Sequence, residues 1–117
     1  MQGGSVVTSL IDDGKIDEIT GGKEGLRRDM FALYFENIGE CIRTMEKHSM
    51  AGRQPPWLNA ALEMKALSVR LGAQQMVLRS QHAIDIASNE GNEKLSLVSL
   101  IRQDVEKLQA FVKNTGT

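Results

Sequence analysis

The spacing of apolar residues constrains this chain most, because long stretches repeat every three or four residues. Such a repeat places side chains on one face of an α-helix. No stretch alternates with a period of two for long enough to predict a strand. The clearest example is the set Phe31, Phe35, Ile38, Ile42 and Met45, and a second is Val98, Ile101, Val105, Leu108 and Val112. The sequence therefore predicts an all-α protein.

Three long helices and a weaker N-terminal segment are expected from this spacing. We predict helices over about 23–49, 55–88 and 93–113, and one or two short helices over 5–20. Long amphipathic helices with short connections are typical of antiparallel bundles. The expected fold is therefore an antiparallel four-helix bundle, made of a short N-terminal helix plus three long helices.

The predicted helix over 55–88 is the longest of the three. Pro55 and Pro56 suit its first turn, where a missing N–H costs nothing, and Gly91 suits its end. Its central stripe consists of Met64, Ser68, Leu71, Gln75 and Leu78. His82 follows Met64 by 18 residues, which is about five helical turns. We therefore expect His82 on the side of this helix that faces the core.

Composition bounds the class of protein. The chain has 117 residues and a net charge of −1, which indicates one globular domain without the basic surface that nucleic acids or anionic membranes require. The lone Cys41 cannot form an intramolecular disulfide, and its apolar neighbours suggest a buried thiol. No leader peptide or membrane-spanning run is visible. We expect a cytoplasmic protein with no nucleic-acid or membrane partner.

Catalytic and metal-binding groups are sparse. One cysteine and the distant His48 and His82 do not make a zinc site. The carboxylate pairs Asp12-Asp13 and Asp17-Glu18 lie among glycines, which favours helix caps and solvated positions over acid–base chemistry. The sequence thus predicts neither an enzyme nor a metal or organic cofactor.

The most specific motif lies at 61–73, which reads Ala-Leu-Glu-Met-Lys-Ala-Leu-Ser-Val-Arg-Leu-Gly-Ala. It resembles the motif of histidine-phosphotransfer (HPt) domains, which runs histidine, any residue, leucine, lysine, glycine, two small residues, two of any type, leucine, glycine and alanine. Lys65 and Ser68 match, Met64 stands for the leucine, and Leu71-Gly72-Ala73 matches unchanged. Ala66 and Leu67 depart from the glycine and the first small residue.

The resemblance extends beyond this motif. Ile16-Asp17 and Thr20-Gly21-Gly22-Lys23 are similar to the short first helix of the family and its Gly-Gly turn, and Phe35 falls where the second helix carries a phenylalanine. The resemblance implies an HPt-like bundle over 15–113, preceded by an N-terminal segment, 1–14, that is a short helix or flexible, and followed by a tail, 114–117.

Leucine stands at the position of the phosphorylated histidine. Leu62 has no lone pair with which to attack a phosphoryl group, so the resemblance excludes ordinary phosphotransfer at this site. It implies instead a non-catalytic binding module of two-component or phosphorelay signalling, which docks a response-regulator receiver domain or a histidine kinase. The expected partner-binding residues are Leu62, Lys65, Ala66, Val69 and Ala73. On a helical wheel Leu62 and Val69 form an apolar strip at the side of the central stripe, with Ala66 and Ala73 between them.

Three alternatives stay open. The strip around Leu62 can belong to a helix that is buried over a wide arc. His82 or His48 can serve as the phosphoacceptor of an active phosphotransfer protein. The chain can also be an unrelated helical adaptor, or a homodimer that buries the strip from Leu62 to Val69 against a second copy. The sequence predicts a monomer or a weak homodimer.

Overall fold

The computed structural model describes residues 10–49, 55–89 and 91–114. Every regular element in these ranges is an α-helix, which confirms the all-α prediction. The helices are α1 (Asp13–Thr20), α2 (Glu24–Lys47), α3 (Pro55–Leu71), α4 (Gln74–Asp85) and α5 (Gly91–Asn114). No helix in the described ranges is long and apolar enough to cross a membrane.

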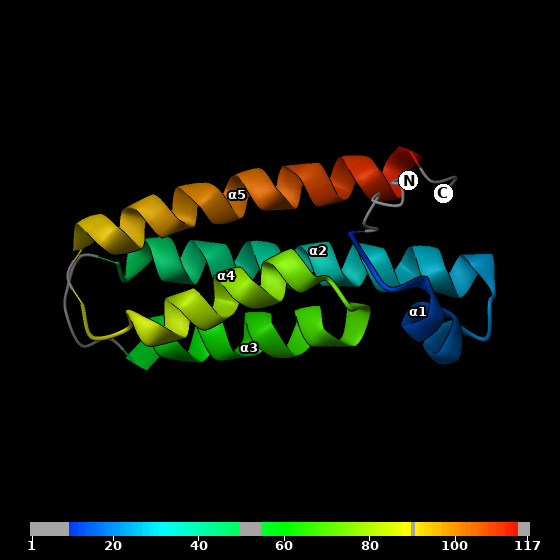
Figure 1. Cartoon of the computed structure of the whole chain (residues 1–117), viewed down its shortest axis with the longest axis horizontal. Coiled ribbons are helices and arrows are strands. Elements are labelled where there is room, and N and C mark those ends of the chain that lie inside the picture. The colour runs from blue at the N-terminus through cyan, green and yellow to red at the C-terminus, as the bar shows by residue number, and fades with distance from the viewer. Residues whose placement is uncertain (1–9, 50–54, 90, 115–117) are drawn as a thin grey trace, which may run out of the picture.

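The four helices from α2 to α5 run alternately in opposite directions (Figure 1). Each packs against the next along the chain, and α5 closes the ring against α2. At about 1.5 Å per residue, α2 spans about 36 Å and α3 only about 26 Å. One end of α2 therefore extends beyond the end of α3, and α1 packs against α2 and α3 there (Figure 1). The predicted helical bundle is confirmed, but its ring is made of α2 to α5 and α1 packs against one end, so the predicted make-up of one short and three long helices is wrong.

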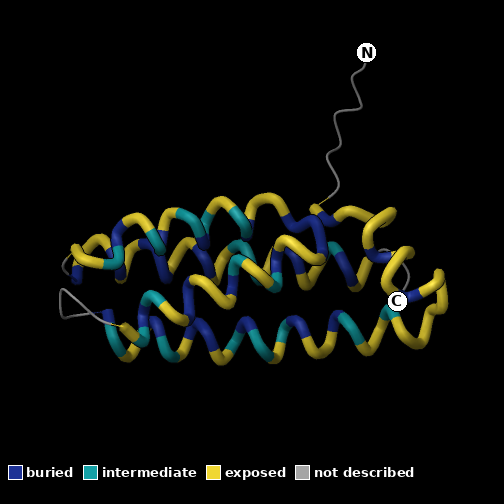
Figure 2. Tube along the Cα trace, turned by 90° about the horizontal axis from the view of Figure 1, so that it is seen from below, coloured by how far each residue is buried: buried dark blue, intermediate teal, exposed yellow. Residues whose placement is uncertain are grey.

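The core follows the predicted helical faces, and each long helix turns buried residues inward at regular intervals (Figure 2). The predicted face of α2 is buried except for the half-buried Phe35, and that of α5 except for the half-buried Val105. Burial of such side chains is worth about 25 cal/mol per Å² of apolar surface. Trp57, on α3, is fully buried, and its indole N–H donates to the carbonyl of Ala83 on α4 at 2.8 Å. This contact fastens α3 to α4.

The single helix predicted over 55–88 is wrong, because the chain reverses at Gly72. Gly72 has a φ of +66°, a left-handed conformation that ends α3, and α4 begins two residues later. The amide of Ala73 donates to the carbonyl of Ser68 at 3.0 Å, which closes the turn. Glycine adopts positive φ without the steric penalty of a side chain, so Gly72 is the residue that allows the reversal. The described ranges accordingly hold four long or medium helices and a short one.

This reversal changes which residues face the core beyond position 72. Met64, Ser68 and Leu71 are buried as expected, whereas Gln75 and Leu78 are exposed. His82 is exposed as well, which contradicts its predicted position on the core side. The helical phase restarts at α4, so a count of turns from α3 does not carry across Gly72. Gly91 begins α5 instead of ending the preceding helix.

The described part of the N-terminal segment holds one helix, which ends in a glycine pair. Residues 5–9 of the predicted segment 5–20 lie outside the described ranges, and α1 begins at Asp13. The side chain of Asp12, just before this helix, accepts a hydrogen bond from the amide of Lys15 at 3.2 Å. This is the helix-capping role expected for that carboxylate. Gly21 and Gly22 both have positive φ, and Gly21 caps the end of α1. A short helix followed by a Gly-Gly turn is therefore present at this point of the chain.

One buried cation supports the junction of α4 and α5. The Lys94 side chain is fully buried, and its ammonium donates to the carbonyl of Ala87 at 2.7 Å and lies 5.1 Å from the ring centroid of Trp57. Burial lowers the pKa of Lys94. The carbonyl and the ring offset part of the cost of burying its charge.

Candidate functional site

The exposed face of α3 carries the residues at the centre of the predicted site. Leu62 is 47% exposed and Val69 is 43% exposed, and Ala66 between them is also exposed. Positions 62, 66 and 69 share one side of the helix, because steps of four and three residues return to the same face. The opposite side of α3 is the core side, where Met64 and Leu71 are buried. We call Leu62, Ala66 and Val69 the α3 strip.

Among the described residues, nothing buries the α3 strip. The sequence left open that most sides of this helix, the strip included, are buried. In the described bundle α3 packs against α1, α2 and α4 only. The solvent side of α3 is left uncovered by these neighbours. Leucine and valine side chains that are about half exposed therefore form an apolar surface that another molecule can cover.

The two remaining predicted site residues have different environments. Lys65 is half-buried, and its ammonium donates to the side-chain carbonyl of Gln81 on α4 at 2.6 Å. Its charge thus lies beside the α3 strip, on the flank that faces α4. Ala73 is only 1% exposed, because it lies in the turn between α3 and α4. The placement of Ala73 on the exposed strip is wrong, again because the helix ends at Leu71.

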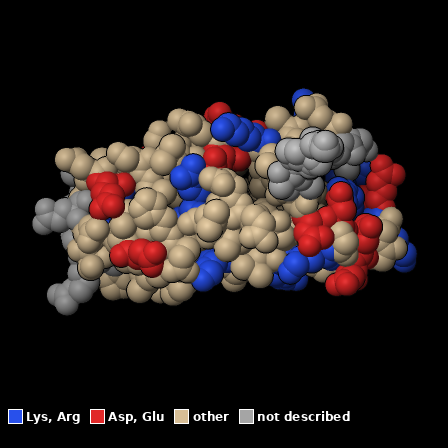
Figure 3. All heavy atoms as spheres, in the orientation of Figure 1, with Lys and Arg blue, Asp and Glu red and all other residues tan. Residues whose placement is uncertain are grey.

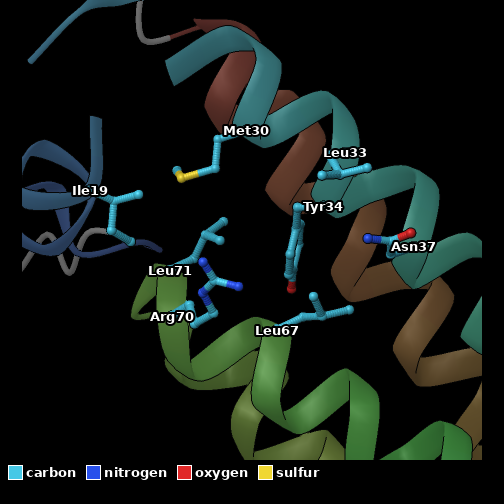
Figure 4. Close-up of a pocket in the computed structure, with 8 residues that line it drawn as sticks. All are labelled: Ile19, Met30, Leu33, Tyr34, Asn37, Leu67, Arg70 and Leu71. Atoms are coloured by element: carbon cyan, nitrogen blue, oxygen red, sulfur yellow. The ribbon is translucent and has the colours of Figure 1, made fainter. Parts of the chain in front are cut away.

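A groove opens on the other flank of α3, between α1, α2 and α3 (Figure 4). Its volume is about 140 Å³. The apolar lining residues are Ile19, Met30, Leu33, Leu67 and Leu71, and the polar ones are Tyr34, Asn37 and Arg70. We call this the α1–α3 groove. It lies beside the strip, because Leu67 and Arg70 directly follow Ala66 and Val69 in the sequence.

The polar groups of the α1–α3 groove differ in their freedom to bind. The hydroxyl of Tyr34 is hydrogen-bonded to that of Ser68 at 2.8 Å, and both residues are buried. Burial raises the pKa of Tyr34 to about 12, against a smaller lowering by Ser68 and a further rise from Cys41, so the phenol stays neutral. Arg70 is exposed, and no carboxylate within the described ranges pairs with it. Its guanidinium points toward the groove (Figure 4).

A more polar hollow of about 240 Å³ lies farther along the α2–α3 interface, and Cys41 is among its lining residues. The thiol is buried, as the sequence predicted. Its pKa is raised to about 12, mainly by burial and in addition by the nearby carboxylates of Glu63 and Glu40. A reactive cysteine requires the opposite shift, toward the thiolate. This arrangement suits a structural thiol and gives no nucleophile.

The two histidines are not on α3, since His82 lies on α4 and His48 caps the end of α2. The side chain of His82, on α4, is 47% exposed, and its Nε2 lies 3.9 Å from a carboxylate oxygen of Glu93. His48 follows the last residue of α2 and is half-buried, as expected for a helix C-terminus. Neither has a lysine three residues later, unlike Leu62, which Lys65 follows. Within the described ranges no three metal-ligating side chains come together.

Charged residues are unevenly distributed over the face of the molecule seen in Figure 3. In Figure 3 the middle of the α3–α4 side carries few charged side chains, whereas acidic and basic residues crowd the end of the molecule formed by α1. A surface with few charges is cheaper to dehydrate than a crowded one. This distribution favours contact with another protein along α3 and α4.

Comparisons with protein families, with curated proteins and with solved structures found no match to this chain. The sequence identified the α3 strip but missed the α1–α3 groove, because the groove requires α1 to pack beside α2 and α3. Ile19 and Leu33, exposed at 48% and 57%, are its apolar rim, and in the sequence they look like ordinary positions on helical faces.

Proposed function

We propose that this chain is a non-catalytic, HPt-like docking module of two-component signalling, which binds a response-regulator receiver domain through the α3 strip. The observation that carries the proposal is the half-exposed position of Leu62 on α3. The resemblance aligns this residue with the phosphorylated histidine of HPt domains. The supporting residues are those of the motif, from Lys65 to Ala73. A histidine kinase is the other partner that the resemblance implies.

The chemistry of the strip supports binding without transfer. A hydrocarbon side chain at position 62 offers no nucleophile, so a docked phosphorylated receiver keeps its phosphoryl group. The same side chain adds apolar area to the contact, and removing apolar surface from water favours association. A partner held in this way competes with functional phosphotransfer proteins for the receiver.

The contribution of Leu62 can be bounded from its exposure. Full burial of a leucine side chain is worth about 1.5–3 kcal/mol, so covering the 47% that remains exposed is worth about 1 kcal/mol. An aspartate at this position removes that gain and adds the cost of desolvating a charge. We therefore expect Leu62→Asp to weaken receiver binding at least tenfold, which corresponds to about 1.4 kcal/mol.

Leu100 provides a matched control for this substitution. It is 38% exposed on α5, and α5 has no contact with α3 among the described residues. Both aspartates replace exposed leucines, so both variants should keep the fold to within about 0.5 kcal/mol. Calorimetric titration with the receiver domains of the same organism should show the tenfold loss for Leu62→Asp and little change for Leu100→Asp.

Three outcomes contradict the proposal. The first is that every receiver and kinase domain fails to bind, and the second is that both aspartate variants bind a receiver equally well. The third is an acid-labile phosphate on His82 or His48 after incubation with a phosphorylated receiver, detected by mass spectrometry. That third result identifies an active phosphotransfer protein, and the docking proposal is then replaced.

A further inference from the structure

The α1–α3 groove has the size of one apolar side chain. A cavity of roughly 150 Å³ lined by aliphatic and aromatic residues holds a benzene-sized group, and the groove measures about 140 Å³. Its rim residues Ile19 and Leu33 are about half exposed, so an inserted side chain also covers apolar surface around the opening. The groove thus suits an aliphatic or aromatic side chain that a partner presents.

Arg70 is the charged residue among those that line the groove. Its guanidinium points toward the opening and has no carboxylate partner within the described ranges (Figure 4). A guanidinium recognises a carboxylate through two parallel N–H donors, and it interacts more strongly beside apolar surface than in open water. Charge complementarity therefore favours a carboxylate next to the inserted apolar side chain.

The groove is continuous with the α3 strip. Arg70 directly follows Val69, and Leu67 directly follows Ala66, so one helix carries both surfaces on neighbouring flanks. A partner segment that covers Val69 reaches Arg70 without further change in the fold. The groove and the strip can thus be parts of one interface.

We propose that the α1–α3 groove receives an apolar side chain of the docked protein while Arg70 binds a carboxylate on the same segment of that partner. This inference rests on the proposed function, because it assigns the groove to the partner of the α3 strip. It specifies the chemistry of that partner: an aliphatic or aromatic residue adjacent to an aspartate or glutamate.

Hexanoate and 1-hexanol are probes that separate the two requirements. Both carry an aliphatic chain that fits the groove, and only hexanoate carries the carboxylate. In ¹H–¹⁵N NMR titrations we expect hexanoate to shift the amides of Ile19, Leu33 and Arg70, with a dissociation constant at least threefold lower than that of hexanol. Arg70→Gln should remove this difference, and Arg43→Gln, at an exposed position on α2, should retain it.

The same variants link the groove to the partner. Arg70→Gln should weaken binding of the receiver at least threefold, and Arg43→Gln should not. Equal affinity for hexanoate and hexanol, shifts confined to other regions, or unchanged receiver binding by Arg70→Gln would overturn the inference. These results are distinguishable from failure of the docking proposal. If a receiver loses affinity with Leu62→Asp but not with Arg70→Gln, the docking proposal stands and only the role of the groove is refuted.

Discussion

Replacement of Gly72 tests the main structural finding, which is the reversal between α3 and α4. The residue has a φ of +66°, and Asp12, which immediately precedes α1, lies in close contact with it. A Cβ at Gly72 would overlap the Cβ of Asp12 and lie 3.1 Å from the amide nitrogen of Asp12. That amide donates to the carbonyl of Leu71 at 2.9 Å. Gly72→Ala therefore disturbs both the turn and the contact with the N-terminal segment.

The expected cost has two parts. A left-handed conformation costs an alanine about 1–2 kcal/mol relative to glycine. Inserting a methyl group into a filled site costs a further 1–3 kcal/mol. Gly21 separates the two parts, because its φ is +65° and a Cβ there meets nothing within 4 Å. We expect Gly21→Ala to show the conformational cost alone, and Gly72→Ala to lose about 1–3 kcal/mol more.

Urea denaturation followed by far-ultraviolet circular dichroism measures both costs. A third variant, Asp12→Gly, removes the Cβ that Gly72→Ala would meet, while glycine remains an acceptable residue before a helix. In the Asp12→Gly background, Gly72→Ala should therefore cost at least about 1 kcal/mol less than in the natural sequence. Equal losses for Gly72→Ala and Gly21→Ala, or no coupling to Asp12, would refute the close approach of the two segments.

Three further predictions concern stability and burial. Arg79→Gln should lower the free energy of unfolding in urea by about 2 kcal/mol, because it leaves the nearly buried carboxylate of Asp104 without its ion-pair partner. Arg102→Gln removes a half-exposed ion pair with Glu46 and should lower it by less than about 0.5 kcal/mol. Equal losses for the two variants would contradict this prediction. Cys41 has its pKa raised from 9.0 to about 12, so the unfolded thiol ionises first and the free energy of unfolding should fall as pH rises from 9 to 12. Cys41→Ala should reduce this slope by up to about 1.4 kcal/mol per pH unit, and an unchanged slope would show that the thiol is not buried. Trp57 is the single tryptophan and is fully buried. Its fluorescence should therefore be blue-shifted and resist quenching by acrylamide until the protein unfolds. Efficient quenching in the native protein would instead place the indole at the surface.

The helical periodicity predicted most of the fold because it records which side of each helix is buried. The faces of α2 and α5 are nearly as expected, and Pro55 begins α3 as a proline suits a first helical turn. The turn at Gly72 was missed because a lone glycine is tolerated inside many helices, and no proline or polar cluster marks the break. The misplacement of His82 and Leu78 followed from that one residue.

The candidate site was predictable in part. Leu62, Ala66 and Val69 lie within a single helix, so their shared face follows from sequence spacing alone. Ala73 falls just beyond the end of that helix, where the spacing rule no longer applies. The groove beside Arg70 could not be predicted, because its walls come from three helices and depend on how α1 packs.

The measurement that tests the central claim most directly is an NMR titration of the ¹⁵N-labelled chain with each receiver domain of its organism. The account predicts that at least one receiver shifts the amides of α3 between residues 58 and 71, most strongly at Leu62, Ala66 and Val69, and leaves those of α5 nearly unchanged. Absence of shifts on α3 with every receiver, or shifts confined to α5, would contradict the assignment of this face as a docking site.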